Sequence, residues 1–197
     1  MSDGFIYWYR TDWEPADAQV LLQSLGAGGL SLSNPATGRI TRITNGPDSW
    51  GEQVPVDRDS LANAAGLNDI EEVNFQLWVN SDADVFTRFR RLRGDVVVAE
   101  FGLDGLRVDE REQAVRTIVG AIRSELVRSS GFVIDRLGVA EDVDWDSVVT
   151  KGAARLTAWP DTLAVRPEVS ARLPELAGVE RREEPPLVIF GRTALLA

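Results

Sequence analysis

Alternation of apolar and polar positions in the middle of the chain predicts a run of β-strands. Apolar residues alternate with mostly polar ones over 75–79, and two further strand-like segments follow at 85–90 and 96–101. Turn-forming residues separate the three segments, which is typical of an antiparallel meander. The segment 82–93 also carries apolar residues at helical spacing, but its β-branched content favours a strand.

An apolar stripe of helical period follows the meander. Apolar residues recur at every third or fourth position between 115 and 126, as on the buried face of an amphipathic helix. Asp109 and Glu112 have the spacing of a capping box, which predicts where this helix begins. Gly131 predicts its end, and the apolar triplet 132–134 predicts a buried strand.

Shorter patterns flank this central part. The aromatic and β-branched segment 5–10 predicts a strand, and Pro15 fits the first turn of a helix. A turn-rich pentapeptide inside 30–43 predicts a hairpin, and 60–65 predicts a short helix. The apolar segment 187–190 predicts a final strand.

These elements together predict an α+β fold. We expect a mostly antiparallel sheet, made of the hairpin and the three-stranded meander, with helices packed on one face. A single domain over 1–197 is expected, because no linker or repeat divides the chain. Its last third, about 140–197, is less regular and punctuated by prolines, and 181–186 is expected to be a charged connector.

Composition excludes several kinds of chemistry. The chain has no cysteine and no histidine, so disulfides, histidine-dependent triads and thiolate or imidazole metal sites are excluded. Lys151 is the single lysine, and no GxxxxGK loop precedes it, which excludes a P-loop site. We therefore expect no cofactor.

The chain carries a surplus of carboxylates. It has 31 acidic and 21 basic residues, which gives a formal net charge of −10. Such a charge repels phosphate backbones, so no nucleic-acid partner is expected. The N-terminal segment lacks the features of a signal peptide, and no apolar run approaches the ~20 residues of a membrane span. A cytoplasmic protein without membrane contact is therefore expected.

Two acidic clusters are candidates for cation sites. Asp142, Asp144 and Asp146 have the spacing that opens a calcium loop, but the later ligand positions of such a loop are missing. Acidic residues are also favoured at a helix start, so no metal is expected here. Asp82 and Asp84 are explained by a turn.

A few residues are candidates for contact with a partner. On a regular strand, Arg88 and Arg90 share one face and Arg91 lies on the other. Trp13 and Trp50 lie in polar, turn-rich surroundings, which predicts exposed aromatic side chains. The candidate partner-binding residues are Trp13, Trp50, Asp82, Asp84, Arg88 and Arg90.

The sequence favours binding over catalysis. We expect a non-enzymatic protein that presents an acidic surface to a basic protein partner, for example an immunity-type protein that neutralises a toxin. Two alternatives stay open. One is an enzyme or small-ligand binder that uses carboxylates and arginines in a cleft. The other is a structural subunit of a larger assembly.

Overall fold

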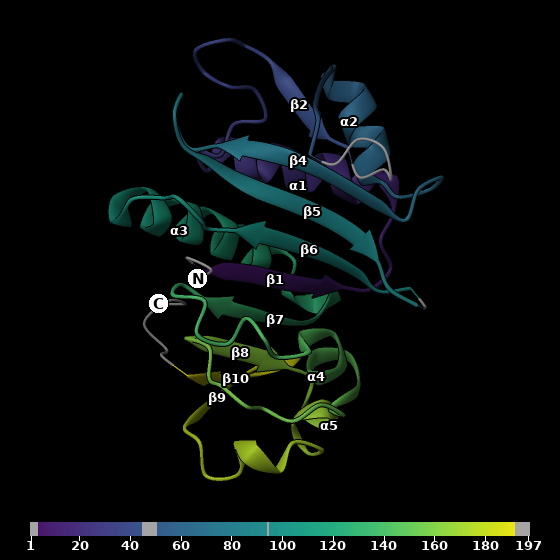
Figure 1. The fold of residues 1–197 in the computed structure, drawn as a ribbon. Helices are drawn as coiled ribbons and strands as arrows, with labels where there is room; N and C mark the ends of the chain where they lie inside the picture. Colours follow the sequence, from purple (N-terminus) through teal and green to yellow (C-terminus); the bar gives the residue numbers. More distant parts are fainter. Residues whose placement is uncertain (1–3, 45–50, 94, 192–197) are drawn as a thin grey trace.

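The computed structural model describes residues 4–44, 51–93 and 95–191. Within these residues the strands form one antiparallel sheet of ten strands in the order β3-β2-β4-β5-β6-β1-β7-β8-β10-β9 (Figure 1). In chain order the strands are β1 (Phe5–Arg10), β2 (Ile40–Ile43), β3 (Gln53–Val56), β4 (Glu72–Trp78), β5 (Asp84–Arg91), β6 (Val97–Gly102), β7 (Ser129–Asp135), β8 (Thr162–Val165), β9 (Arg181–Glu184) and β10 (Leu187–Gly191).

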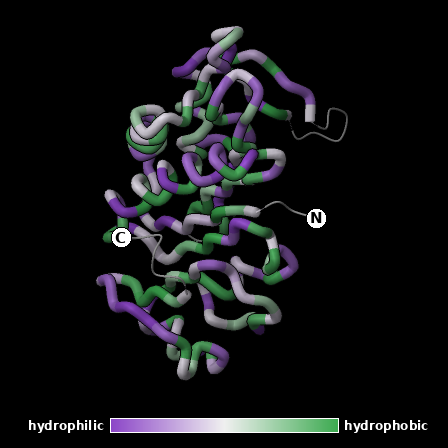
Figure 2. The backbone as a smooth tube through the Cα atoms, turned by 90° about the vertical axis from the view of Figure 1, so that its left-hand side faces the viewer, coloured by the Kyte–Doolittle hydropathy of each residue, from purple (hydrophilic) through white to green (hydrophobic). Residues whose placement is uncertain are grey.

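The helices differ in length and in the face of the sheet that they cover. They are α1 (Pro15–Ala27), α2 (Arg58–Ala65), α3 (Val108–Ser124), α4 (Trp145–Lys151) and α5 (Pro167–Ser170), with 3₁₀ turns at Leu126–Arg128 and Pro174–Leu176. Figure 1 shows α1 and α3 behind the strands β4, β5, β6 and β1. Seen from the side in Figure 2, the molecule is longer across the strands than it is thick.

Two hydrophobic cores lie on opposite faces of the sheet. The first contains buried side chains of α1, α2 and α3 together with Trp8 and Phe89 of the sheet. The second contains Tyr9 and Val133 of the sheet with Trp145 of α4. Because successive side chains of a strand point to opposite faces, the neighbours Trp8 and Tyr9 enter different cores. β1 is therefore apolar over nearly its whole length.

The predicted meander is confirmed. β4 pairs with β5 and β5 with β6, both antiparallel, so the alternative of a helix over 82–93 is wrong. The predicted hairpin over 30–43 is much smaller than expected. It is reduced to a bridge between Ser33 and Ile40, because β2 pairs mainly with β3 and β4.

The α+β class with a mostly antiparallel sheet is confirmed, with three differences in detail. The longer helices share one face as expected, but α4 and α5 lie on the other face. The helix α3 begins at Val108 rather than after Asp109, because Glu110 accepts the backbone N–H of Arg107. The charged segment expected as a connector contains the edge strand β9, which pairs with β10.

Of the helices in the described residues, none has the length and apolar character needed to cross a bilayer. The single-domain organisation and the cytoplasmic location stay predictions.

Candidate functional site

The two halves of the sheet differ on the face opposite α1 and α3. Side chains of β1, β7, β8 and β10 pack there under α4 and α5. The strands β4, β5 and β6 lie in front in Figure 1, with no helix before them. Phe86 of β5 is 44% exposed on this face, and the side chain of Arg88 is 36% exposed. We call the front of β4, β5 and β6 the open face.

A row of polar side chains crosses the open face. The strand registers place Asn74 opposite Arg88, Arg88 opposite Glu100, and Glu100 opposite Tyr7. Adjacent strands lie about 4.8 Å apart, so neighbours in this row are in contact range. The Nε of Arg88 donates to Glu100 at 2.7 Å. Asn74, the end of the row, is 2% exposed.

Arg90 connects the open face to α4. Its Nε donates to Glu100, and its two terminal nitrogens donate to the carboxylate of Asp146, each at 2.8 Å. This two-point contact has the geometry that suits guanidinium and carboxylate groups. The hydroxyl of Tyr9 donates to the same Asp146 carboxylate at 3.0 Å. Asp146 thereby ties the helix α4 to strands β1 and β5.

The two tyrosines and Arg90 of this cluster each keep one protonation state around neutral pH. Burial, aided by the nearby Glu100 carboxylate, raises the pKa of Tyr7 to about 12. Burial also raises the pKa of Tyr9, and Asp146 adds to this effect. Burial disfavours the charge of Arg90, but hydrogen bonds to Asp146 and Glu100 outweigh it and raise its pKa. Groups whose pKa lies far from 7 stabilise the structure of a surface and do not exchange protons near pH 7.

The structure brings several of the predicted binding residues together. Arg88 and Arg90 share the open face as predicted, whereas Arg91 donates to the carbonyl of Leu67 at 3.3 Å. Asp84 also lies on the open face, opposite Trp78, and accepts a hydrogen bond from Gln76.

The other acidic candidate is set apart from this group. Asp82 lies in the turn between β4 and β5, as predicted, where it is exposed and accepts from the hydroxyl of Ser81.

The prediction that Trp13 is exposed is wrong. Its side chain is 7% exposed, and its indole N–H donates to the carbonyl of Ala65 at 3.1 Å. Trp13 covers the guanidinium of Arg10, whose central carbon lies 4.8 Å from the ring centroid. The polar residues around Trp13 therefore mark the start of α1 and not an exposed loop. Trp50, the other predicted aromatic, lies outside the described residues.

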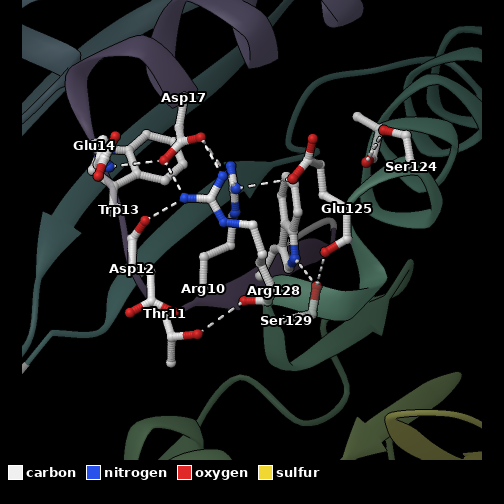
Figure 3. A network of polar contacts seen from close by, with 12 residues as sticks. Arg10, Thr11, Asp12, Trp13, Glu14, Asp17, Ser124, Glu125, Arg128 and Ser129 are labelled. Carbon is white, nitrogen blue, oxygen red and sulfur yellow. Dashed lines mark hydrogen bonds and ion pairs between the residues drawn. The ribbon is translucent and has the colours of Figure 1, made fainter.

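Arg10 is the centre of a buried polar network (Figure 3). Arg10 is 1% exposed, and it lies over the ring of Trp8 as well as that of Trp13. It donates to Glu125 at 3.1 Å and lies 3.7 Å from the Asp17 carboxylate. Arg128 donates to the same Asp17 at 2.7 Å. The network joins β1, the start of α1 and the turn before β7. Its geometry therefore indicates a structural role.

A tightly held loop follows β7. The buried Asp135 accepts the backbone N–H groups of Leu137 at 3.1 Å and Ala140 at 2.7 Å. The indole of Trp145 donates to the carbonyl of Ala140 at 2.9 Å. With its backbone fixed in this way, the loop leaves Leu137 67% and Val139 65% exposed. Large apolar side chains on an ordered loop are candidates for a binding surface.

Asp144 and Asp146, at the start of α4, have structural partners. Asp144 caps α4 by accepting the backbone N–H of Ser147 at 3.1 Å, as expected for acidic residues at a helix start. Asp146 is bound to Arg90. Across residues 4–44, 51–93 and 95–191, no group of three acidic side chains is arranged to hold a metal ion.

Sequence reasoning missed several residues of these surfaces. Glu100 is a lone acid inside the apolar run 96–101, and that pattern signals a buried charge with a partner. Arg10 closes an aromatic strand and gives the same signal. Leu137 and Val139 carry no such signal, because their exposure depends on how Asp135 folds the loop.

Comparison of the chain with models of protein families, with curated proteins and with solved structures finds no match.

Proposed function

We propose that this protein is a non-enzymatic binding protein whose acidic front surface docks a basic protein partner. The observation that carries the proposal is the loop after β7, which presents Leu137 and Val139 to solvent on a fixed backbone. Exposed apolar residues rimmed by charge are typical of protein-binding surfaces. Neutralisation of a basic toxin is one concrete form of such a function.

The loop begins in the same row of strand positions as Phe86 of the open face. A row across the sheet runs from Phe86 over Gly102 and Phe5 to Asp135. The row spans three strand spacings, or about 14 Å, so Phe86 and the start of the loop fit within one interface. We call the surface made by Phe86, Leu137, Val139, Glu141 and Asp142 the docking face.

Charge favours a basic occupant. Glu141 and Asp142 are exposed beside the apolar residues of the loop, and Glu141 lies near enough to Tyr7 to influence its pKa. The arginines of the open face are already bound to carboxylates. With a net charge of −10, the chain attracts positively charged partners and speeds their association.

The test uses capture from a native lysate of the source organism with three forms of the protein. The docking variant is L137S/V139S, and the control V127S changes a 79% exposed valine at the other end of β7. We expect wild type and control to capture a stoichiometric basic protein. The docking variant should bind that protein at least about tenfold more weakly, because central apolar contacts dominate interfaces.

Binding of the captured protein is then measured at two salt concentrations with E141Q/D142N. This variant should associate more slowly than wild type at low salt and similarly at high salt, because salt screens exposed charges. The proposal is wrong if no stoichiometric partner is recovered, or if the partner binds L137S/V139S as tightly as wild type.

A further inference from the structure

A hollow of about 410 Å³ lies at the end of β7 opposite the docking face. It is formed where β1 ends, β7 begins and α4 meets α5, and its lining includes Thr11 and Ser130. Val149 of α4 and Val169 of α5 add apolar surface. The hollow therefore combines apolar walls with hydroxyl groups, which suits a small amphipathic ligand.

Two arginines line this hollow with most of their hydrogen-bond donors available. Arg166 donates to the carbonyl of Val127 at 3.4 Å, and Arg172 donates to the carbonyl of Lys151 at 3.3 Å. Within the described ranges, neither guanidinium has a carboxylate within ion-pair distance. A guanidinium has five N–H donors, so each arginine can still bind a ligand.

The charge of the hollow contrasts with that of the whole chain. Arg166 and Arg172 face one acidic lining residue, Glu168. Lys151 ends α4 next to Arg172. The protein has a net charge of −10, so the positive charge of the hollow is opposite in sign to that of the whole chain. Such a local positive charge favours the binding of anions.

We propose that this hollow binds a small oxyanion that carries an apolar body. Arg166 and Arg172 bind the oxyanion through charge-assisted hydrogen bonds. The hydroxyl of Ser130, for which no side-chain hydrogen bond is found within the described residues, supplies a further donor, and the two valines contact the apolar part. Carboxylate and phosphate groups share this chemistry. The site is separate from the docking face, so either proposal can fail without the other.

The test is a titration of the full chain with acetate, butyrate and inorganic phosphate at constant ionic strength, followed by NMR. We expect saturable shifts of residues around the hollow. Butyrate should bind several-fold more tightly than acetate, because its longer chain covers the valines. Phosphate binding more tightly than butyrate identifies a phosphate ligand, and the reverse order identifies a carboxylate.

Four variants assign the binding to the hollow. R166Q and R172Q should each weaken binding about tenfold, since each removes a charged donor. E168Q should tighten it, because it removes the opposing carboxylate, and a folding defect would not produce that change. R155Q alters an exposed arginine outside the lining and should bind like wild type. Absence of saturation with all three anions, or R166Q and R172Q that bind like wild type, would overturn the proposal.

Discussion

At the level of single residues, buried charges in this protein are held by ion-pair partners from other elements of the fold. Arg10 of β1 contacts Glu125, which is 115 residues away. Glu100 of β6 is bound by Arg88 and Arg90 of β5. Such groups contribute little when all partners are present, but loss of one partner leaves a charge without compensation.

Replacement of Arg10 by alanine should therefore be strongly destabilising. In the R10A variant, Glu125 loses the guanidinium that binds it. The packing of that guanidinium between the indole rings of Trp8 and Trp13 is lost as well. We expect the free energy of unfolding to fall by about 3 kcal/mol. Urea denaturation followed by tryptophan fluorescence measures this change. The control R155A, at an exposed position, should change stability by less than about 0.5 kcal/mol, and equal effects of the two variants would contradict the expectation.

The raised pKa of Tyr7 predicts a loss of stability at alkaline pH. Its pKa is raised from 10.0 to about 12 in the folded protein, so the folded state holds the phenolic proton more tightly than the unfolded chain does. The resulting contribution to stability is complete below pH 10 and is lost as the pH rises towards 12.

Ultraviolet absorbance of the Y9F variant measures this directly, because Tyr7 is then the single tyrosine. We expect tyrosinate to appear with a midpoint well above pH 10, or together with unfolding followed by circular dichroism. A midpoint at the ordinary value in the folded variant would show that the phenol is not desolvated.

At the level of elements, the packing of α4 on the sheet depends on a glycine. A Cβ at Gly131 of β7 would lie 2.6 Å from the side chain of Val149 and would also overlap the carbonyl of Ala164. Gly120 of α3, by contrast, has open space around its α-carbon. The two glycines form a matched pair for the same substitution.

We expect G131A to lower the free energy of unfolding by about 2 kcal/mol, because the added methyl group overlaps the backbone carbonyl of Ala164 in β8 and the side chain of Val149 in α4. G120A should raise it by up to about 1 kcal/mol, because alanine favours the helix and restricts the unfolded chain. Thermal or urea unfolding of both variants checks the opposite signs. A G131A variant as stable as wild type would mean that β8 and α4 do not pack as closely around Gly131 as described.

At the level of the whole molecule, both edges of the sheet are unsuited to further pairing. Pro55 lies in the edge strand β3 and has no N–H to donate. The other edge strand, β9, consists of the charged residues Arg181–Glu184. Proline and charge are the usual means by which proteins prevent edge-to-edge association.

Wild-type protein should therefore sediment without edge-mediated association at micromolar concentration. Replacement of all four residues of β9 by threonine keeps strand propensity and removes the charge. We expect this variant to associate in a concentration-dependent way, as measured by analytical ultracentrifugation. A variant that sediments like wild type would show that charge is not what protects this edge.

The parts of the fold that sequence could predict are those with a clear local period. The meander over 75–101 and the apolar stripe of α3 were identified because alternation and helical spacing are properties of neighbouring residues. β9 was missed because its residues are charged, and it is a strand through its pairing with β10. Strand order depends on contacts between distant segments, which no local pattern encodes.

The candidate surfaces were predicted less well for the same reason. Alternation along β5 placed Arg88 and Arg90 together, but Asp146, which binds Arg90, lies 56 residues away in the chain. Trp13 is buried because its ring packs on the guanidinium of Arg10 and its indole N–H donates to the carbonyl of Ala65. Whether an aromatic residue is buried or exposed depends on such tertiary neighbours.

The place of β1 in the sheet has a consequence for folding kinetics. β1 is the first strand of the sheet along the chain, yet it lies between β6 and β7, whose residues follow much later. Its two ladders therefore close large loops, and topologies rich in such distant contacts fold slowly. During synthesis on the ribosome, the apolar strand Phe5–Arg10 cannot pair until β6 has emerged, and its second ladder forms only after Asp135 follows. The nascent chain therefore exposes this apolar strand for a long time, which favours binding by chaperones.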